Sequence, residues 1–133
     1  MPPPYFTVRF RTEAAAIDWP AQFVIITAYA TTGERWDAAR EVAADAALAE
    51  TLEALGVWYT RITGYTPETG HAEPGWAAAL SLEAGCELGL RFAQDAIYVV
   101  EGDALGVTFC DARRGVVPVG AFRERLDRDA HAT

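Results

Sequence analysis

The sequence contains no lysine and no asparagine, and Ser81 is its only serine. Without lysine, a phosphate-binding loop of the GxxxxGK[ST] type is excluded. Since Ser81 is placed to cap a helix, a Ser-His-Asp triad is nearly excluded as well. The two histidines, His71 and His131, are far apart and belong to no HExxH or clustered Cys/His pattern. We therefore expect no catalytic residues of these types, no metal ligands and no cofactor.

Cysteine and long apolar runs are also scarce. Cys86 and Cys110 have no CxxC spacing, so we expect two reduced, buried thiols. No apolar run approaches the ~18 residues of a membrane span, and the Met-Pro-Pro-Pro start does not resemble a signal peptide. These features predict a cytoplasmic protein that does not insert into a membrane. Arginine as the sole strongly basic residue, together with abundant alanine, indicates a GC-rich bacterial or phage genome.

Acidic residues are in excess. The 133-residue chain has 19 acidic and 11 basic residues, for a net charge of −8 with neutral histidines. Such a surface repels phosphate backbones and anionic membranes, so direct nucleic-acid binding is not expected. The 51% hydrophobic content is ordinary for a globular protein, and no linker or repeat divides the chain. We expect one domain over residues 1–133.

Hydrophobic periodicity predicts an α+β fold. The expected strands are 5–11, 23–29, 57–65, 76–80, 96–100 and 105–110, and the expected helices are 34–55, 81–94 and a short one within 120–129. A polar loop is expected over 64–75, and Glu101 to Ala104 predicts a hairpin turn. The central order is that of a ferredoxin-like split βαβ sandwich, an antiparallel sheet with two helices on one face, here with extra N- and C-terminal strands.

The first predicted helix has an unusual apolar stripe. Ala44, Leu48, Leu52 and Leu55 share the face expected to pack on the sheet. The same stripe continues toward the N-terminus through the carboxylates of Asp37 and Glu41, which leaves two interpretations open. These carboxylates either line a polar pocket beside Thr31 and Thr32 that holds a cation, a metal or a basic group, or they extend beyond the sheet and are solvated at a helix N-terminus.

The composition of the second predicted helix indicates a structural role. Gly85 and Gly89 lie on its inner face with Cys86, Leu82 and Phe92. Each glycine costs about 1 kcal/mol relative to alanine inside a helix, and close approach of the backbone to the sheet is the expected compensation. No histidine lies near Cys86 in the sequence, so a buried apolar role is favoured over a nucleophilic one.

The segment from Tyr65 to Trp76 is the richest functional candidate. Tyr65, His71 and Glu73 supply an aromatic face, a titratable ring and a carboxylate within a long connection. The alternative is an elaborated hairpin in which Trp76 is a core residue. Arg61 also offers a partner for Glu73 or for the helix carboxylates, which would make the group structural.

An ordered set of short segments resembles a known family. Residues 25–29 read Ile-Ile-Thr-Ala-Tyr, Glu73-Pro74 follows, and 88–98 read Leu-Gly-Leu-Arg-Phe-Ala-Gln-Asp-Ala-Ile-Tyr. Over roughly residues 22–111 the chain is similar to the bacterial domain-of-unknown-function family numbered 3293. The resemblance implies a shared role for Thr27, Glu73 and Gln94, and it supplies no reaction.

This chain departs from the pattern of that family at several polar positions. Ala30-Thr31 stands where the resemblance implies Asn-Pro, Gly75 where it implies Ser, and Ala93 where it implies Gly. Asp37 and Glu41 occupy the helix region where the pattern has serine and asparagine. A polar site shared by the family would therefore be altered here.

The favoured hypothesis is a non-enzymatic acidic domain that binds a protein or a small ligand through the 65–76 segment and the start of the first helix. The candidate binding residues are Glu73, His71, Tyr65, Asp37, Glu41, Thr27 and Gln94. One alternative is a carboxylate-based enzyme, with or without Mg²⁺, acting on a small or nucleotide-like substrate, which requires Asp37, Glu41 and Glu73 to converge. Another is an acidic phage-type inhibitor that mimics nucleic acid.

The C-terminal segment predicts a homodimer. Residues 116–122 are largely apolar, and Pro118 suits an edge strand rather than a central one. Exposed apolar strips of this kind often close a dimer. The alternative is that residues 116–133 fold back over their own sheet.

Overall fold

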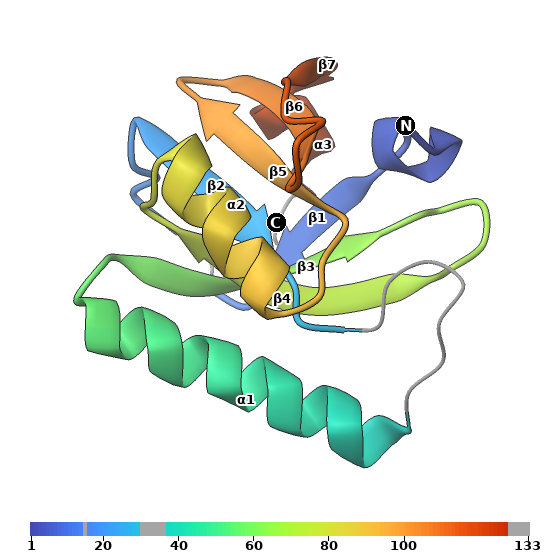
Figure 1. Cartoon of the computed structure of the whole chain (residues 1–133). Coiled ribbons are helices and arrows are strands. Elements are labelled where there is room, and N and C mark those ends of the chain that lie inside the picture. The colour runs from blue at the N-terminus through green and yellow to red at the C-terminus, as the bar shows by residue number, and fades with distance from the viewer. Residues whose placement is uncertain (15, 30–36, 128–133) are drawn as a thin grey trace.

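The computed structural model describes residues 1–14, 16–29 and 37–127 and has an α+β fold. Its strands are β1 (Arg9–Thr12), β2 (Gln22–Ile26), β3 (Tyr59–Tyr65), β4 (Ala72–Ala78), β5 (Ala96–Glu101), β6 (Ala104–Phe109) and β7 (Val117–Ala121). Its helices are the 3₁₀ turn η1 (Pro3–Phe6), α1 (Ala38–Leu55), α2 (Leu82–Arg91) and α3 (Phe122–Arg125). The strands form one antiparallel seven-stranded sheet in the order β1-β3-β4-β2-β5-β6-β7 (Figure 1).

Two predicted boundaries are wrong around the β3–β4 hairpin and at the N-terminus. β4 begins at Ala72 rather than Trp76, so the connection is only residues 66–71 and Glu73 lies on a strand. Pro74 is tolerated there because β2 pairs with β4 only from Trp76 onward, which leaves this part of β4 with a single neighbour. The predicted strand 5–11 is divided into η1 and the shorter β1, since the Pro3-Pro4 pair favours a tight turn.

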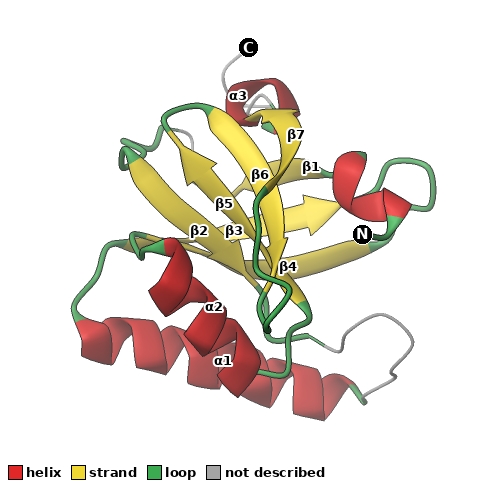
Figure 2. Cartoon of the chain, turned by 45° about the horizontal axis from the view of Figure 1, so that its top comes forward, coloured by secondary structure: helices red, strands yellow, loops and turns green. Residues whose placement is uncertain are grey.

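The long helices lie on one face of the sheet, which we call the helix-covered face (Figure 2). Leu48 and Leu52 of α1 are fully buried there, and Cys86 of α2 joins them in the same cluster. Leu55 is a correction, because it is 55% exposed where the stripe predicted packing on the sheet. It is the last helical residue, directly before the left-handed Gly56 cap, and it does not join the cluster that holds Leu48 and Leu52.

The glycines of α2 confirm the predicted close approach. A Cβ atom on Gly85 would lie 2.8 Å from a methyl of Val24, and one on Gly89 would lie 2.7 Å from the sulfur of Cys110. Only glycine lets the backbone of α2 pack this closely on β2 and β5. The hydroxyl of Ser81 accepts a hydrogen bond from the Ala84 amide, as predicted for the N-cap.

The opposite side of the sheet is its concave face. The sheet is curled, and the segment after α3 reaches the edge strand β1, where Leu126 bridges Phe10 and the Asp127 amide donates to the Phe10 carbonyl at 2.7 Å. A second cluster fills one end of this face, where Phe23, Phe122 and Trp19 contact one another with ring centroids 5.0–5.2 Å apart. We call this the closed end of the concave face.

The C-terminal segment folds onto its own sheet, as in the second interpretation given for it. Pro118 lies in the edge strand β7, which pairs with β6, and Phe122 is buried at the closed end. Val116 and Val117 are 48% and 37% exposed. The homodimer stays a prediction, with these two valines as its available apolar surface. Among the described helices, none is both long enough and apolar enough to cross a membrane.

Candidate ligand-binding site

A cavity of about 720 Å³ opens at the other end of the concave face. Its apolar floor comes from neighbouring strands and is formed by Val8, Phe10, Ile25, Ile62 and Tyr98. The 3₁₀ turn η1, with Pro4 and Tyr5, covers one side, and both Figure 1 and Figure 2 place it beside the β3–β4 hairpin. A cavity of this size, mostly apolar with a few polar groups, is typical of a small-molecule site.

Glu73 projects into this cavity from β4. Its partner in the β3–β4 register is Gly64, and opposed residues of an antiparallel pair point to the same face. A Cβ atom on Gly64 would lie 3.4 Å from the Phe10 ring and 3.6 Å from Val8, so this position faces the floor. Because Gly64 has no side chain, β3 places no side chain beside Glu73 at this register position.

The Glu73 carboxylate has little electrostatic support. Its one ion-pair contact among the described residues is with His71, at 3.8 Å from Oε1 to Nε2, and His71 is 70% exposed. Burial raises the pKa of Glu73, His71 offsets part of this effect, and the charge of Glu41 adds to the increase. The site therefore holds a carboxylate that the fold itself disfavours in its charged form.

The charge of Glu73 contributes to the raised pKa values of three tyrosines. Burial raises the pKa of Tyr5 and of Tyr98, and the nearby Glu73 charge raises both further. Burial also raises the pKa of Tyr29, with smaller contributions from acidic groups that include Glu41 and Glu73. The Tyr5 and Tyr98 rings are 5.9 Å apart, and Tyr98 meets Phe10 edge-on at 5.3 Å. Glu73 thus shares the cavity with several aromatic rings.

Thr27 and Gln94 hold one wall of the cavity together. Thr27 Oγ1 donates to Gln94 Oε1 at 3.0 Å, and Gln94 Nε2 donates to the carbonyls of Tyr29 and Phe92 at 2.7 and 3.1 Å. Both amide hydrogens of Gln94 are used, and the residue is 8% exposed. Gln94 therefore positions the end of β2 against the start of β5, where both line the cavity.

Gly75 of β4 packs closely against Ile26 and Thr27. A Cβ atom here would lie 2.6 Å from the Ile26 carbonyl oxygen and 2.8 Å from the Thr27 methyl. Backbone contacts this short leave no room for the serine that the family resemblance implies at Gly75. The departure from the family pattern is consistent with the local packing of β4 on β2.

The structure brings six of the seven predicted binding residues to one cavity. Glu73, His71, Tyr65, Glu41, Thr27 and Gln94 all line it. Asp37 does not; its carboxylate accepts from the Arg40 amide at 2.8 Å and caps α1. Glu41, one turn further along, reaches the cavity from the first turn of the helix. Asp37 is therefore a carboxylate at the helix N-terminus, as in the second interpretation, whereas Glu41 lines the cavity and a bound cation there stays a prediction.

Tyr65 contributes to the lining in a different way from the other tyrosines. Its hydroxyl donates to the Asp127 carboxylate, which also accepts from Arg9 at 2.8 Å. This group joins β1 and β3 to the segment after α3. Thr31, Thr32 and His131 lie outside the described residues.

Sequence reasoning missed Tyr5, Tyr29 and Tyr98 as cavity residues. They come from η1, the end of β2 and β5, and nothing in the linear pattern brings these elements together. The one available signal was alternation, because Tyr98 lies between the buried residues Ile97 and Val99 and therefore points to the opposite face.

Arg61 pairs with a helix carboxylate that the sequence analysis did not name. Arg61 binds Asp45 of α1 through two hydrogen bonds of 2.8 Å, and its guanidinium lies 3.8 Å from the ring centroid of Trp76. This group belongs to the helix-covered face, and Trp76 packs against the core cluster, as in the alternative given for this segment. Arg61 is thus occupied and does not neutralise Glu73.

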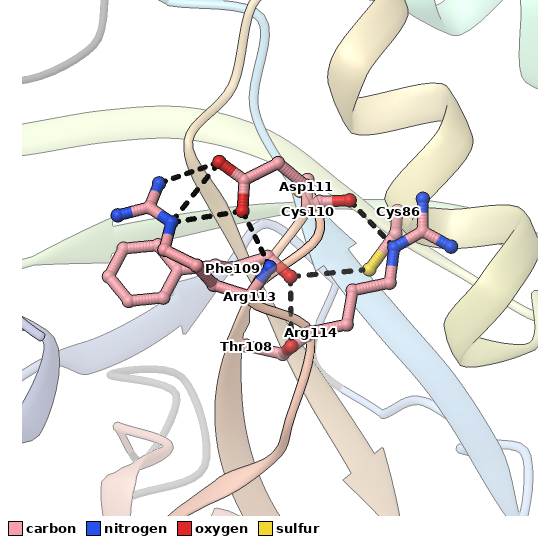
Figure 3. A network of polar contacts seen from close by, with 7 residues as sticks. All are labelled: Cys86, Thr108, Phe109, Cys110, Asp111, Arg113 and Arg114. Carbon is pink, nitrogen blue, oxygen red and sulfur yellow. Dashed lines mark hydrogen bonds and ion pairs between the residues drawn. The ribbon is translucent and has the colours of Figure 1, made fainter.

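A second polar cluster lies at the end of β6 (Figure 3). Asp111 binds Arg113 through several hydrogen bonds of 2.8–3.2 Å, which lower the pKa of Asp111 to about 2. Arg114 donates to the Cys110 carbonyl at 2.6 Å. Because its charges are paired internally, we assign this cluster a structural role.

The cysteines near that cluster are buried and free. Burial raises the pKa of the Cys86 thiol, and it raises that of Cys110 to about 12. Thiols in this state are poor nucleophiles. Across residues 1–14, 16–29 and 37–127, no group of three or more His, Cys, Asp or Glu side chains is arranged to hold a metal ion.

Comparison with known families identifies the chain. A family model described as a protein of unknown function, DUF3293, matches residues 26–97, which is more than half of the sequence. The protein belongs to this DUF3293 family. No curated protein and no solved structure matches the chain. The matched region contains all seven predicted binding residues, while η1, β1 and most of the C-terminal strands lie outside it.

Proposed function

We propose that this DUF3293 protein is a non-enzymatic binding domain for a small organic molecule, held in the cavity at the open end of the concave face. The observation that carries the proposal is the unneutralised carboxylate of Glu73 in a cavity of about 720 Å³ with an apolar floor. Its size falls within the range of drug-sized ligand sites. A small ligand is favoured over a protein partner because the site is a hollow rather than a flat apolar patch.

The chemistry of the lining supports binding over catalysis. Glu41 and Glu73 both line the cavity, whereas Asp37 caps α1 and does not line it. The enzyme hypothesis required all three carboxylates to converge, and only two of them share the cavity. The acidic nucleic-acid mimic finds no specific support in the placement of the described charges.

The proposal is tested by a screen of neutral, cationic and anionic small molecules, with ligand-observed NMR for detection and amide chemical shifts for mapping. We expect hits that perturb residues of β3, β4 and β5 at the cavity. Gly64→Leu places a side chain beside Glu73 and is expected to remove binding while the circular dichroism spectrum is retained. An absence of hits, or hits unaffected by this variant, would contradict the proposal.

We also propose that the central strands and long helices form a split βαβ unit of the ferredoxin-like type. The order β3-β4-β2-β5, with α1 after β2 and α2 after β4, supports this assignment. β1 extends the sheet at one end, and β6 with β7 extends it at the other. In this arrangement the extensions supply the curl that forms the cavity.

A further inference from the structure

The charge balance of the cavity carries an inference about its ligand that rests on the proposed function. Among the described residues that line the cavity, the charged side chains are the acids Glu41 and Glu73, and no arginine is present. His71, the remaining titratable cavity residue with a possible positive charge, is mostly exposed at the rim. The interior therefore attracts cations and repels anions.

The aromatic lining of the cavity also favours a positively charged ligand. Tyr5, Tyr98 and Phe10 form a contiguous set of rings, with Tyr29 on the far wall. The face of an aromatic ring carries partial negative charge and attracts a desolvated ammonium group. Neither the Tyr5 nor the Tyr29 hydroxyl has a hydrogen-bond partner in the described part of the chain, which leaves both available to a ligand.

The shape of the cavity indicates what must be attached to the cation. The carboxylate of Glu73 stands at one side of a floor made by Val8, Ile25 and Ile62. A bare inorganic cation would find only two carboxylates and would leave the apolar lining without a contact, whereas an apolar body on the cation would pack against that lining. We infer that the cavity binds an organic ammonium ion whose charged head pairs with Glu73 and whose apolar body lies on the floor.

The inference is tested with three probes of nearly equal size, namely 2-phenylethylammonium, 2-phenylethanol and phenylacetate. Dissociation constants are measured by amide chemical-shift titration at pH 7. We expect the ammonium ion to bind about tenfold more tightly than the alcohol, and phenylacetate to bind most weakly. Glu73→Gln is expected to bring the ammonium ion and the alcohol to within about threefold of each other.

Glu68→Gln is the matched control. Glu68 is exposed on the same hairpin and does not line the cavity, so this variant makes the same change in net charge without altering the site. It is expected to keep the preference for the ammonium ion. Equal preference in Glu73→Gln and Glu68→Gln would show that net charge alone attracts the cation, and it would overturn the inference.

The outcomes separate this inference from the proposed function. Binding of 2-phenylethanol as tight as that of the ammonium ion, removed by Gly64→Leu, would overturn the choice of ligand and leave the binding site in place. Tighter binding of phenylacetate than of the ammonium ion would also overturn the choice of ligand and leave the binding site in place. If none of the three probes binds, the inference fails, and the mixed screen decides the proposed function by itself.

Discussion

Two carboxylates lie against opposite faces of the same strand pair and are treated differently by the fold. Asp45 reaches Arg61 of β3 from α1 and is held by two hydrogen bonds beside the Trp76 ring. Glu73 of β4 points to the concave face, where its one ion-pair contact among the described residues is an exposed histidine. On the helix-covered face, Arg61 neutralises the charge of Asp45. On the concave face, the charge of Glu73 is left for another molecule to neutralise.

The two ends of the concave face show the same contrast in their packing. At the closed end, Phe122 is 2% exposed and contacts Phe23, Trp19 and Phe10. At the open end, Tyr29 lies on the wall of the cavity. Phe122→Ala is therefore expected to lower the free energy of unfolding by about 3–5 kcal/mol, and Tyr29→Ala by well under half of that.

Urea denaturation followed by tryptophan fluorescence measures both changes. Trp19 and Trp58 lie at the closed end and report its packing directly. Equal losses in the two variants would show that the open end is packed like the closed one. In that case the cavity would not be a separate functional region.

The Asp45–Arg61 pair provides the next largest effect. Arg61→Met leaves the Asp45 carboxylate without its partner, and we expect a loss of about 2–3 kcal/mol because both side chains are mostly buried. Asp45→Leu added to Arg61→Met removes the unpaired charge and is expected to recover a large part of that loss. A double variant as unstable as Arg61→Met would show that the guanidinium acts through its packing on Trp76 instead.

Glu73→Gln is expected to raise the free energy of unfolding, and its effect should be the smallest of the set. Because the pKa of Glu73 is raised in the folded protein, ionisation destabilises the fold as the pH rises from the usual range of a carboxyl group through the raised pKa. The glutamine variant should therefore be more stable than the wild type at pH 7. The difference should vanish near pH 3.5, where both side chains are neutral.

Thermal unfolding at a series of pH values measures this effect, with Glu68→Gln as the control for net charge. Loss of stability in Glu73→Gln at pH 7 would mean that the charged carboxylate has a partner that supports the fold. A side chain whose replacement stabilises the protein and weakens ligand binding is the pattern expected at a functional site.

The contrast between the faces was only partly predictable from the sequence. The α+β class, both long helices and the capping of α2 by Ser81 followed from periodicity and end signals. The approach of α2 to the sheet followed from Gly85 and Gly89, because helix glycines need a compensating contact. These features depend on residues close together in the chain.

The candidate site depends on contacts between distant segments. Glu73, Thr27 and Gln94 were found through short segments that resemble a family, and the structure places them around one cavity. The aromatic wall could not be predicted, because it needs the curl that carries η1 and Tyr5 over β5. Asp45 was overlooked because the helix stripe was assigned from its leucines, although Asp45 lies four residues beyond Glu41 on the same face.

The most direct test is the pKa of Glu73 itself, measured by a carbon-detected NMR titration of the side-chain carboxyl groups. A short unstructured peptide with the sequence of residues 70–76 provides the reference. We predict that the titration midpoint of Glu73 in the protein lies above its midpoint in the peptide, and that it decreases toward the peptide value when saturating 2-phenylethylammonium is added. A Glu73 midpoint in the free protein equal to or below that in the peptide would contradict the view that the concave face holds an unneutralised carboxylate.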